Sequence, residues 1–268
     1  MRLLLKRVDK DYYGVNEYIQ PIAKQALKFE QFVYTVCEIL NVYNQYNPHI
    51  VNDVVKALKM AEYRIDDNDT GMLKEYRFLA KLMEEFYWQV VEDENFEKKA
   101  KEIDKDLRDP YKRLGQYRGL LLEEIISAAV YERFQNHKFC KGCIVYVDGI
   151  MVKLGYGWCN SEHKQTIDIA GWADCEKYGE FYECKVSPRR FLIENYKYFI
   201  QLKQVLDAKG AEKYILALAS ADSRNNLLSQ KRALEKEDPE CDIDFTLIGR
   251  EDIFRILNYN IPNRDIIA

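Results

Sequence analysis

The 268-residue chain contains no long run of apolar side chains. Near its amino end only three consecutive leucines, residues 3–5, stand before charged residues return. A signal peptide needs an apolar region of about 7–15 residues, and a membrane-spanning helix needs about 18 or more. The sequence therefore predicts a cytoplasmic protein that neither carries a signal peptide nor crosses a membrane.

The chain also has no excess of positive charge. Its formal net charge is −4 and its isoelectric point is about 5.6. This balance excludes the global basic surface with which many proteins hold nucleic acid by bulk electrostatics. Any affinity for nucleic acid has to come from a local group of basic residues or from a bound metal ion.

Several common catalytic motifs are missing. The sequence has no G-x-S-x-G elbow, no G-x-x-x-x-G-K-[ST] phosphate loop and no G-x-G-x-x-G fingerprint. It has only three histidines, His49, His137 and His163, and none is close to a convincing nucleophile. These absences argue against serine or cysteine hydrolases, P-loop enzymes and dinucleotide-dependent enzymes.

Seven cysteines are present, and in a reducing compartment they are thiols or metal ligands rather than disulfides. Four residues have a spacing close to that of structural zinc sites, C-x₂-C followed by Cys and His. They are Cys140, Cys143, Cys159 and His163. The alternative is that these cysteines are small core residues. The remaining four have no partner spacing and are predicted to be buried thiols: Cys37, Cys175, Cys184 and Cys241.

The first 110 residues have the apolar spacing of helices. Apolar side chains recur every three or four positions over residues 22–40, where Pro21 can begin a helix, and again from residue 51 and over 73–90. The acidic loop before the third helix lacks a glutamate at the twelfth position of a calcium loop, where Arg77 stands, and is read as a solvated turn. A charged tract that ends at Pro110 is predicted to be a solvated helix.

After Pro110 the sequence predicts alternating helices and strands. A helix over about 116–134 is followed by β-branched and aromatic residues, with a hairpin-turn signal at Asp148-Gly149. Further strands are expected at 166–174 and 180–186, then a helix over 191–209 and strands over 213–220 and 242–249. We therefore expect an α/β protein with a helical region, 1–110, that serves recognition or oligomerisation, and a second domain, 111–268.

The stretch "EFYECKVSP", 180–188, places Glu183 and Lys185 two residues apart, so their side chains share one face of a strand. Asp168 lies 15 residues before Glu183, and a turn near Lys177 would bring the two carboxylates together. Like carboxylates repel each other unless a cation neutralises them. The alternative is a surface ion pair, but Phe181 on the same face argues against simple solvation.

These residues resemble a known family. "TIDIAG" and "YECK" are similar to the signature of the PD-(D/E)XK nuclease superfamily, and "IDI…ECK" most resembles its Mrr-like branch. The resemblance implies a restriction-endonuclease-like αβββαβ core. It covers the chain after Pro110 and leaves the first 110 residues unassigned. Ile167 stands where the family name has proline, which is a mild departure.

Residue by residue, the resemblance implies Mg²⁺ ligands at Asp168, Glu183 and the carbonyl oxygen of Cys184, with Lys185 positioning the attacking water. A further acid on the preceding helix is implied at Glu123, within Gly119-Leu-Leu-Leu-Glu123, although Glu124 adjoins it. Some relatives carry a glutamine on the following helix, for which Gln201 and Gln204 are candidates.

The expected activity is hydrolysis of phosphodiester bonds in DNA with Mg²⁺, for which Mn²⁺ can substitute. Local phosphate contacts are expected from a group of basic residues beyond the motif. They are Arg189, Arg190, Lys197 and Lys203. The alternatives are a ribonuclease, or a non-catalytic nucleic-acid-binding or assembly module braced by zinc. Double-strand cutting would favour a homodimer.

Overall fold

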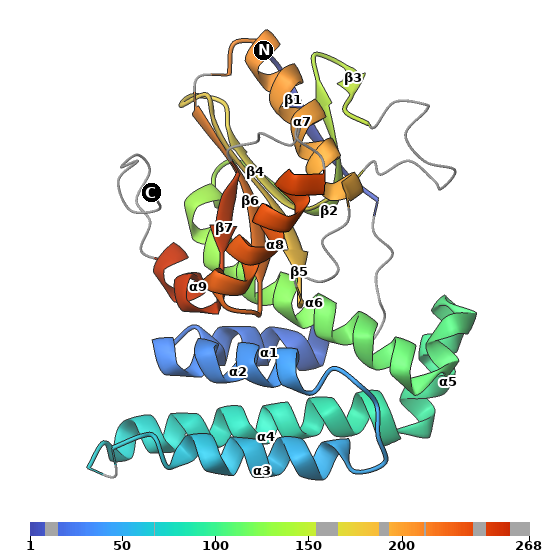
Figure 1. The fold of residues 1–268 in the computed structure, drawn as a ribbon, viewed down its shortest axis with the longest axis vertical. Coiled ribbons are helices and arrows are strands. Elements are labelled where there is room, and N and C mark those ends of the chain that lie inside the picture. Colours follow the sequence, from blue (N-terminus) through green and yellow to red (C-terminus); the bar gives the residue numbers. More distant parts are fainter. Residues whose placement is uncertain are drawn as a thin grey trace. The chain divides into compact units, whose positions relative to one another are not determined.

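A computed structural model describes residues 1–8, 16–66, 68–153, 166–187, 193–211, 213–237 and 245–257 (Figure 1). The chain forms two compact units. One comprises residues 11–128, and the other comprises residues 1–10 together with 129–268. The predicted α/β class is confirmed: a helical region is followed by a mixed seven-stranded sheet interleaved with helices.

The helical unit is built from amphipathic helices whose apolar stripes form its core. In chain order they are α1 (Asn16–Ala26), α2 (Glu30–Val42), α3 (Ile50–Glu62), α4 (Thr70–Glu92), α5 (Glu94–Ile103), the 3₁₀ helix η1 (Lys105–Arg108) and most of α6 (Pro110–Tyr131). Some of the buried polar groups of this unit are paired, as burial favours. The Tyr76 hydroxyl donates to the Leu58 carbonyl at 2.8 Å, and the Arg113 guanidinium donates to the Leu107 carbonyl at 2.9 Å.

Three details of this unit differ from the sequence prediction. The single helix expected over 22–40 is two helices, because Phe29 adopts an extended backbone with φ −144° and ψ 142° between them. The apolar spacing continues across this break and so conceals it. Pro21 lies inside α1 rather than at its start, and Pro110 begins α6, where a missing N–H costs no helical hydrogen bond.

The second unit contains the sheet. Its strands are β1 (Leu3–Arg7), β2 (Lys138–Val147), β3 (Ile150–Met151), β4 (Ile167–Ala173), β5 (Tyr178–Lys185), β6 (Lys213–Ser220) and β7 (Thr246–Ile248). They lie in the order β1-β2-β4-β5-β6-β7, and β3 pairs with β2. The first four of this order are antiparallel, whereas β5, β6 and β7 are parallel to one another.

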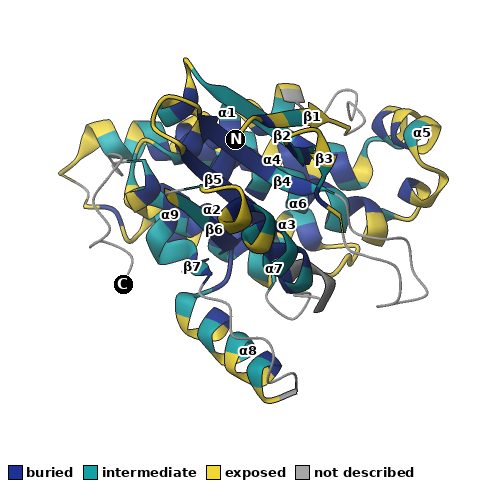
Figure 2. Cartoon of the chain, turned by 90° about the horizontal axis from the view of Figure 1, so that it is seen from above, coloured by how far each residue is buried: buried dark blue, intermediate teal, exposed yellow. Residues whose placement is uncertain are grey.

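Helices complete the second unit. They are η2 (Glu132–Phe134), α7 (Ile193–Ala208), α8 (Arg224–Glu237) and α9 (Arg250–Ile256). α7 connects β5 to β6 and α8 connects β6 to β7, because parallel neighbours need a crossover. Leu202 of α7 and Leu227 of α8 share one buried cluster with Phe181 and Trp172 of the sheet. Figure 2 shows the central strands β4 and β5 as buried, whereas most of α8 is half-buried or exposed.

The predicted hairpin turn is confirmed. Asp148 and Gly149 have φ values of 51° and 82°, the left-handed conformations of a tight turn between β2 and β3. The turn expected at 176–179 lies two residues earlier, at Asp174–Lys177. The predicted strand over 242–249 is shorter, because β7 is Thr246–Ile248 and residues 241–244 lie outside the described part.

Two features were missing from the sequence prediction. The strand β1 pairs with β2 and so belongs to the sheet unit, although the expected boundary at 110/111 grouped it with the helices. The helices α8 and α9 were not predicted either. Within the described residues, no helix is long and apolar enough to cross a membrane.

Candidate active site

The β4–β5 hairpin places the predicted acidic residues side by side. Strand pairing extends from Ala173–Tyr178 at the turn to Ile169–Tyr182. The next residues along the two strands are Asp168 and Glu183. There the Asp168 carboxylate accepts the backbone N–H of Cys184 at 2.7 Å. The end of the hairpin is therefore closed by the side chain of a candidate ligand.

A local irregularity in β2 accompanies this arrangement. Side chains of a regular strand alternate between the two faces. Cys140 and Cys143 are three residues apart, yet both pack against the same core, and Gly142 between them has φ 52°. In β4, directly across, Ile167 and Ala170 also reach that core together. Asp168 thus lies where both strands depart from regular alternation.

Three oxygen atoms converge on the ammonium of Lys185. Its Nζ lies 2.6 Å from Glu183 Oε1, 3.6 Å from Asp168 Oδ2 and 3.1 Å from the carbonyl oxygen of Cys184. The Glu183 side chain is 1% exposed, that of Asp168 19% and that of Lys185 26%. The three oxygens come from the residues that the sequence resemblance implied as metal ligands.

The electrostatics of this group favour a cation. Burial alone would lower the pKa of Lys185, but the carboxylates of Asp168 and Glu183 raise it well above its usual value. Lys185 is therefore a fixed positive charge at neutral pH. One ammonium against two carboxylates leaves the group with an excess of negative charge in a largely buried place, where a divalent cation would be stabilised.

The donor set fits a hard divalent cation. Mg²⁺ prefers oxygen ligands and usually keeps several waters, so it is bound by one or two carboxylates rather than by a complete protein cage. Two carboxylates and one carbonyl that already surround a positive nitrogen satisfy this preference. The residues that would hold the ion are Asp168, Glu183 and Cys184.

Glu123 is half-buried on α6, in the helical unit. Gly119 and Glu123 are four residues apart on that helix, so they lie on the same side of it. The assignment of Glu123 to the metal site stays a prediction.

The candidate nucleic-acid residues on α7 differ in their surroundings. Lys197 and Gln201 are half-buried, and Gln201 donates to the exposed Gln204 at 3.3 Å. Lys203 instead donates to Asp207 at 2.7 Å and to the Tyr214 hydroxyl at 3.3 Å.

Position along the sheet separates Lys203 from the carboxylates. Tyr214 pairs with Gly179 near the start of β5, whereas Lys185 ends that strand. Lys203 is thus held toward the opposite end of β5 from the carboxylates, and its phosphate contact stays a prediction. Arg189 and Arg190 lie outside the described residues.

The predicted zinc ligands are described only in part. Cys143 is fully buried in the core of the sheet unit, and Cys140 is half-buried against the same core. Cys159 and His163 lie outside the described residues. The zinc site stays a prediction.

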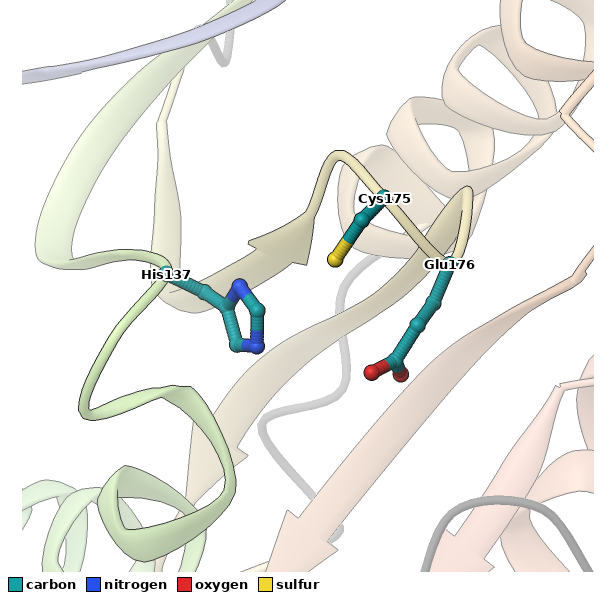
Figure 3. A group of neighbouring side chains, drawn as sticks. All are labelled: His137, Cys175 and Glu176. Carbon is teal, nitrogen blue, oxygen red and sulfur yellow. The ribbon is translucent and has the colours of Figure 1, made fainter.

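A second group of ligand-type side chains gathers at the other end of the β4–β5 hairpin. His137, Cys175 and Glu176 have ligand atoms within 4.8 Å of one another, and Figure 3 shows the three side chains around one space. Cys175 and Glu176 are exposed, so water can solvate their polar atoms, and their grouping does not by itself indicate a metal.

The predictions of buried thiols have mixed outcomes. Cys37 and Cys184 are buried as predicted, whereas the prediction for Cys175 was wrong because it is exposed. Cys241 lies outside the described residues.

Sequence reasoning missed a charged network on the opposite face of β5. Arg133 donates to both oxygens of Glu180, at 2.9 and 2.6 Å, and the hydroxyls of Tyr178 and Tyr182 donate to the same carboxylate. Arg133 also donates to the carbonyl of Ile256 at the end of α9. The spacing of Tyr178, Glu180 and Tyr182 on one strand face was the available signal. The network is satisfied internally and joins η2, β5 and α9.

No family model matches this chain, and no curated protein matches it. The functional interpretation therefore rests on the residues of the site and their geometry.

Proposed function

We propose that this protein is a metal-dependent nuclease that hydrolyses phosphodiester bonds in DNA, with Asp168, Glu183 and Lys185 at its active site. The observation that carries the proposal is the convergence of Asp168, Glu183 and the Cys184 carbonyl on a single cationic nitrogen. A surface ion pair would not need a carboxylate as deeply buried as that of Glu183.

The order of elements supports the restriction-endonuclease-like interpretation. The helix α6 is followed by β2, β4 and β5, which are antiparallel neighbours, then by α7 and the parallel strand β6. This order matches the αβββαβ core that the sequence resemblance implies. In that core the acidic and lysine residues belong on two adjacent strands, as they do on β4 and β5.

The site residues divide the chemistry among them. A bound divalent cation supplies Lewis-acid polarisation of a phosphoryl oxygen and lowers the pKa of a coordinated water. Asp168 and Glu183 hold the ion, and the hydrogen bond from Cys184 N–H fixes the Asp168 carboxylate. Lys185, released from the carboxylates, is placed to orient the attacking water and to stabilise negative charge that develops on the phosphate.

Substrate binding has to be local, because the net charge of −4 gives no long-range attraction. Lys197 and Gln201 lie on α7, the helix that follows the strand bearing Glu183 and Lys185. Arg189 and Arg190 precede that helix in the sequence. We assign phosphate contacts to these residues. We assign to the helical unit either recognition of the substrate or the joining of two copies of the protein.

The experiment is cleavage of supercoiled, linear and single-stranded DNA, and of RNA, in Mg²⁺, Mn²⁺ or chelator. The parent is compared with Asp168→Asn and Lys185→Ala, and with Lys203→Ala as a control for loss of a lysine away from the site. We expect metal-dependent cleavage of DNA that both site variants lose and Lys203→Ala keeps.

Each other outcome has a defined meaning. Cleavage of RNA alone would make the protein a ribonuclease with the same site. Equal cleavage by Asp168→Asn and the parent would overturn the site assignment. Nucleic-acid binding without cleavage, abolished by zinc chelation, would favour the non-catalytic module.

A further inference from the structure

Helix α7 buries a tyrosine hydroxyl that has no partner. Tyr198 is fully buried in the cluster that joins α7 to the sheet, together with Phe181 and Cys143. Within the described residues its hydroxyl makes no hydrogen bond. A buried hydroxyl without a partner costs folding free energy, and phenylalanine would fill the same space without that cost. The hydroxyl therefore calls for an explanation other than packing.

The surroundings of Tyr198 connect it with the candidate active site. Phe181 and Glu183 project from the same face of β5, and Phe181 packs with Tyr198 in one buried cluster. Tyr198 therefore lies on the side of the sheet that carries the Glu183 carboxylate. Burial raises the pKa of its hydroxyl, which stays protonated at neutral pH. A protonated phenol is a neutral hydrogen-bond donor, which can support a carboxylate without competing for a cation.

We propose that Tyr198 is a positioning residue for Glu183, donating a hydrogen bond to its carboxylate when a divalent cation replaces the Lys185 ammonium. This inference rests on the proposed metal site. In the structure described here the Lys185 ammonium bonds Glu183 Oε1 at 2.6 Å and so orients the carboxylate. Once that ammonium turns to substrate, another donor has to hold Glu183, because carboxylate ligands of metals are themselves hydrogen-bonded.

The test compares Tyr198→Phe with Tyr87→Phe. Tyr87, on α4 of the helical unit, is also fully buried, and among the described residues its hydroxyl likewise has no partner. The two variants therefore remove the same kind of group, and only Tyr198 belongs to the unit that contains Glu183. Mn²⁺ binding to the full chain is titrated by electron paramagnetic resonance, with Asp168→Asn as the site control, and thermal unfolding is followed without metal.

We expect Tyr198→Phe to bind Mn²⁺ about 10–100-fold more weakly than the parent. Tyr87→Phe should bind as the parent does, and neither variant should unfold at a lower temperature. Equal Mn²⁺ affinity for Tyr198→Phe and the parent would overturn the inference and leave the proposed nuclease standing. A clear drop in its metal-free unfolding temperature would also overturn it, since the hydroxyl would then be structural.

Failure of the proposed function has a different signature. If the parent binds no Mn²⁺, or if Asp168→Asn binds as tightly as the parent, the metal site itself is wrong and the role of Tyr198 is rejected with it. If Tyr198→Phe weakens Mn²⁺ binding but the parent cleaves no nucleic acid, the positioning role is supported and hydrolysis is not.

Discussion

The Asp168 carboxylate accepts the backbone N–H of Cys184 at 2.7 Å and so joins the ends of β4 and β5. The same oxygen lies 3.6 Å from the Lys185 ammonium. Asp168 therefore has two separable roles. It accepts a backbone hydrogen bond that joins two strands, which contributes to folding, and it supplies negative charge, which the proposed metal site needs.

Asp168→Asn and Asp168→Ala separate these roles. The asparagine oxygen can still accept from Cys184, so we expect its free energy of unfolding to stay close to that of the parent. Alanine leaves that N–H without its acceptor and should cost about 1–3 kcal/mol. Both variants should lose metal-dependent cleavage. Urea unfolding and the nuclease assay measure the two effects, and full activity in Asp168→Asn would contradict the metal-ligand role.

The pH dependence of Lys185 follows from its raised pKa. A lysine whose pKa is higher in the folded than in the unfolded chain contributes stability that is fully present below its unfolded value, about 10.4. This contribution is lost only as the pH rises through the higher folded value. The stabilisation from Lys185 should therefore be constant through neutral and mildly alkaline pH.

Lys185→Met tests this in metal-free protein. We expect a loss of about 3 kcal/mol, near the lower end for removal of one partner from a buried pair because this lysine is partly exposed. The loss should be constant from pH 7 to 9 and shrink above about pH 10. Mg²⁺ should restore part of the lost stability by neutralising the two carboxylates. Urea unfolding across this pH range is the measurement, and a loss that falls steeply between pH 7 and 9 would contradict the assignment.

The Arg133–Glu180 pair is a structural counterpart on the other face of β5. The Glu180 side chain is 0% exposed and that of Arg133 is 8% exposed, so water cannot solvate either charge if its partner is removed. Glu180→Gln leaves the guanidinium without its counter-charge and should cost about 3–5 kcal/mol. Tyr182→Phe removes a hydrogen bond donated to Glu180 and a longer one accepted from Arg133, and should cost about 1.5–3 kcal/mol.

A double variant checks that the cost of Glu180→Gln comes from an uncompensated charge. Arg133→Met with Glu180→Leu removes both charges, so it should be less destabilised than the sum of its single variants. Unfolding free energies from urea titration complete the cycle. Additive losses would show that the two charges act independently.

The sequence allowed prediction of the part of the site that depends on strand alternation and on a local hairpin turn. Strand alternation placed Glu183 and Lys185 on one face, and a single tight hairpin brought Asp168 beside them. The Arg133–Glu180 pair joins residues 47 positions apart, from a helix end to a strand, so the local spacing around Glu180 does not identify Arg133 as its partner. Tyr198 was hidden for a similar reason, because its helical position looks like any other core position.

The fold shows the same limit. Strand β1 pairs Leu3 with Val147, and a short apolar run contains nothing that identifies so distant a partner. Helix α8 was not predicted, although parallel pairing of β6 with β7 requires a crossover between them. Parallel pairing is itself a tertiary property, so that requirement became visible only with the sheet.

Gly142 provides a last test, because its backbone conformation accompanies the irregular position of Asp168. Its φ of 52° is left-handed, and a side chain there should cost about 1–2 kcal/mol. Gly142→Ala should therefore destabilise the protein by that amount and weaken Mn²⁺ binding, since the strand opposite Asp168 would shift to relieve the strain.

Gly115→Ala is the matched control. Gly115 lies within α6, where an added Cβ meets nothing within 4 Å, and alanine should stabilise the helix by up to about 1 kcal/mol. Urea unfolding and Mn²⁺ titration of both variants distinguish backbone strain from a general intolerance of glycine replacement. If Gly142→Ala is as stable as the parent, the left-handed conformation is not required. If it is destabilised yet binds Mn²⁺ normally, the irregularity in β2 serves the fold and not the metal site.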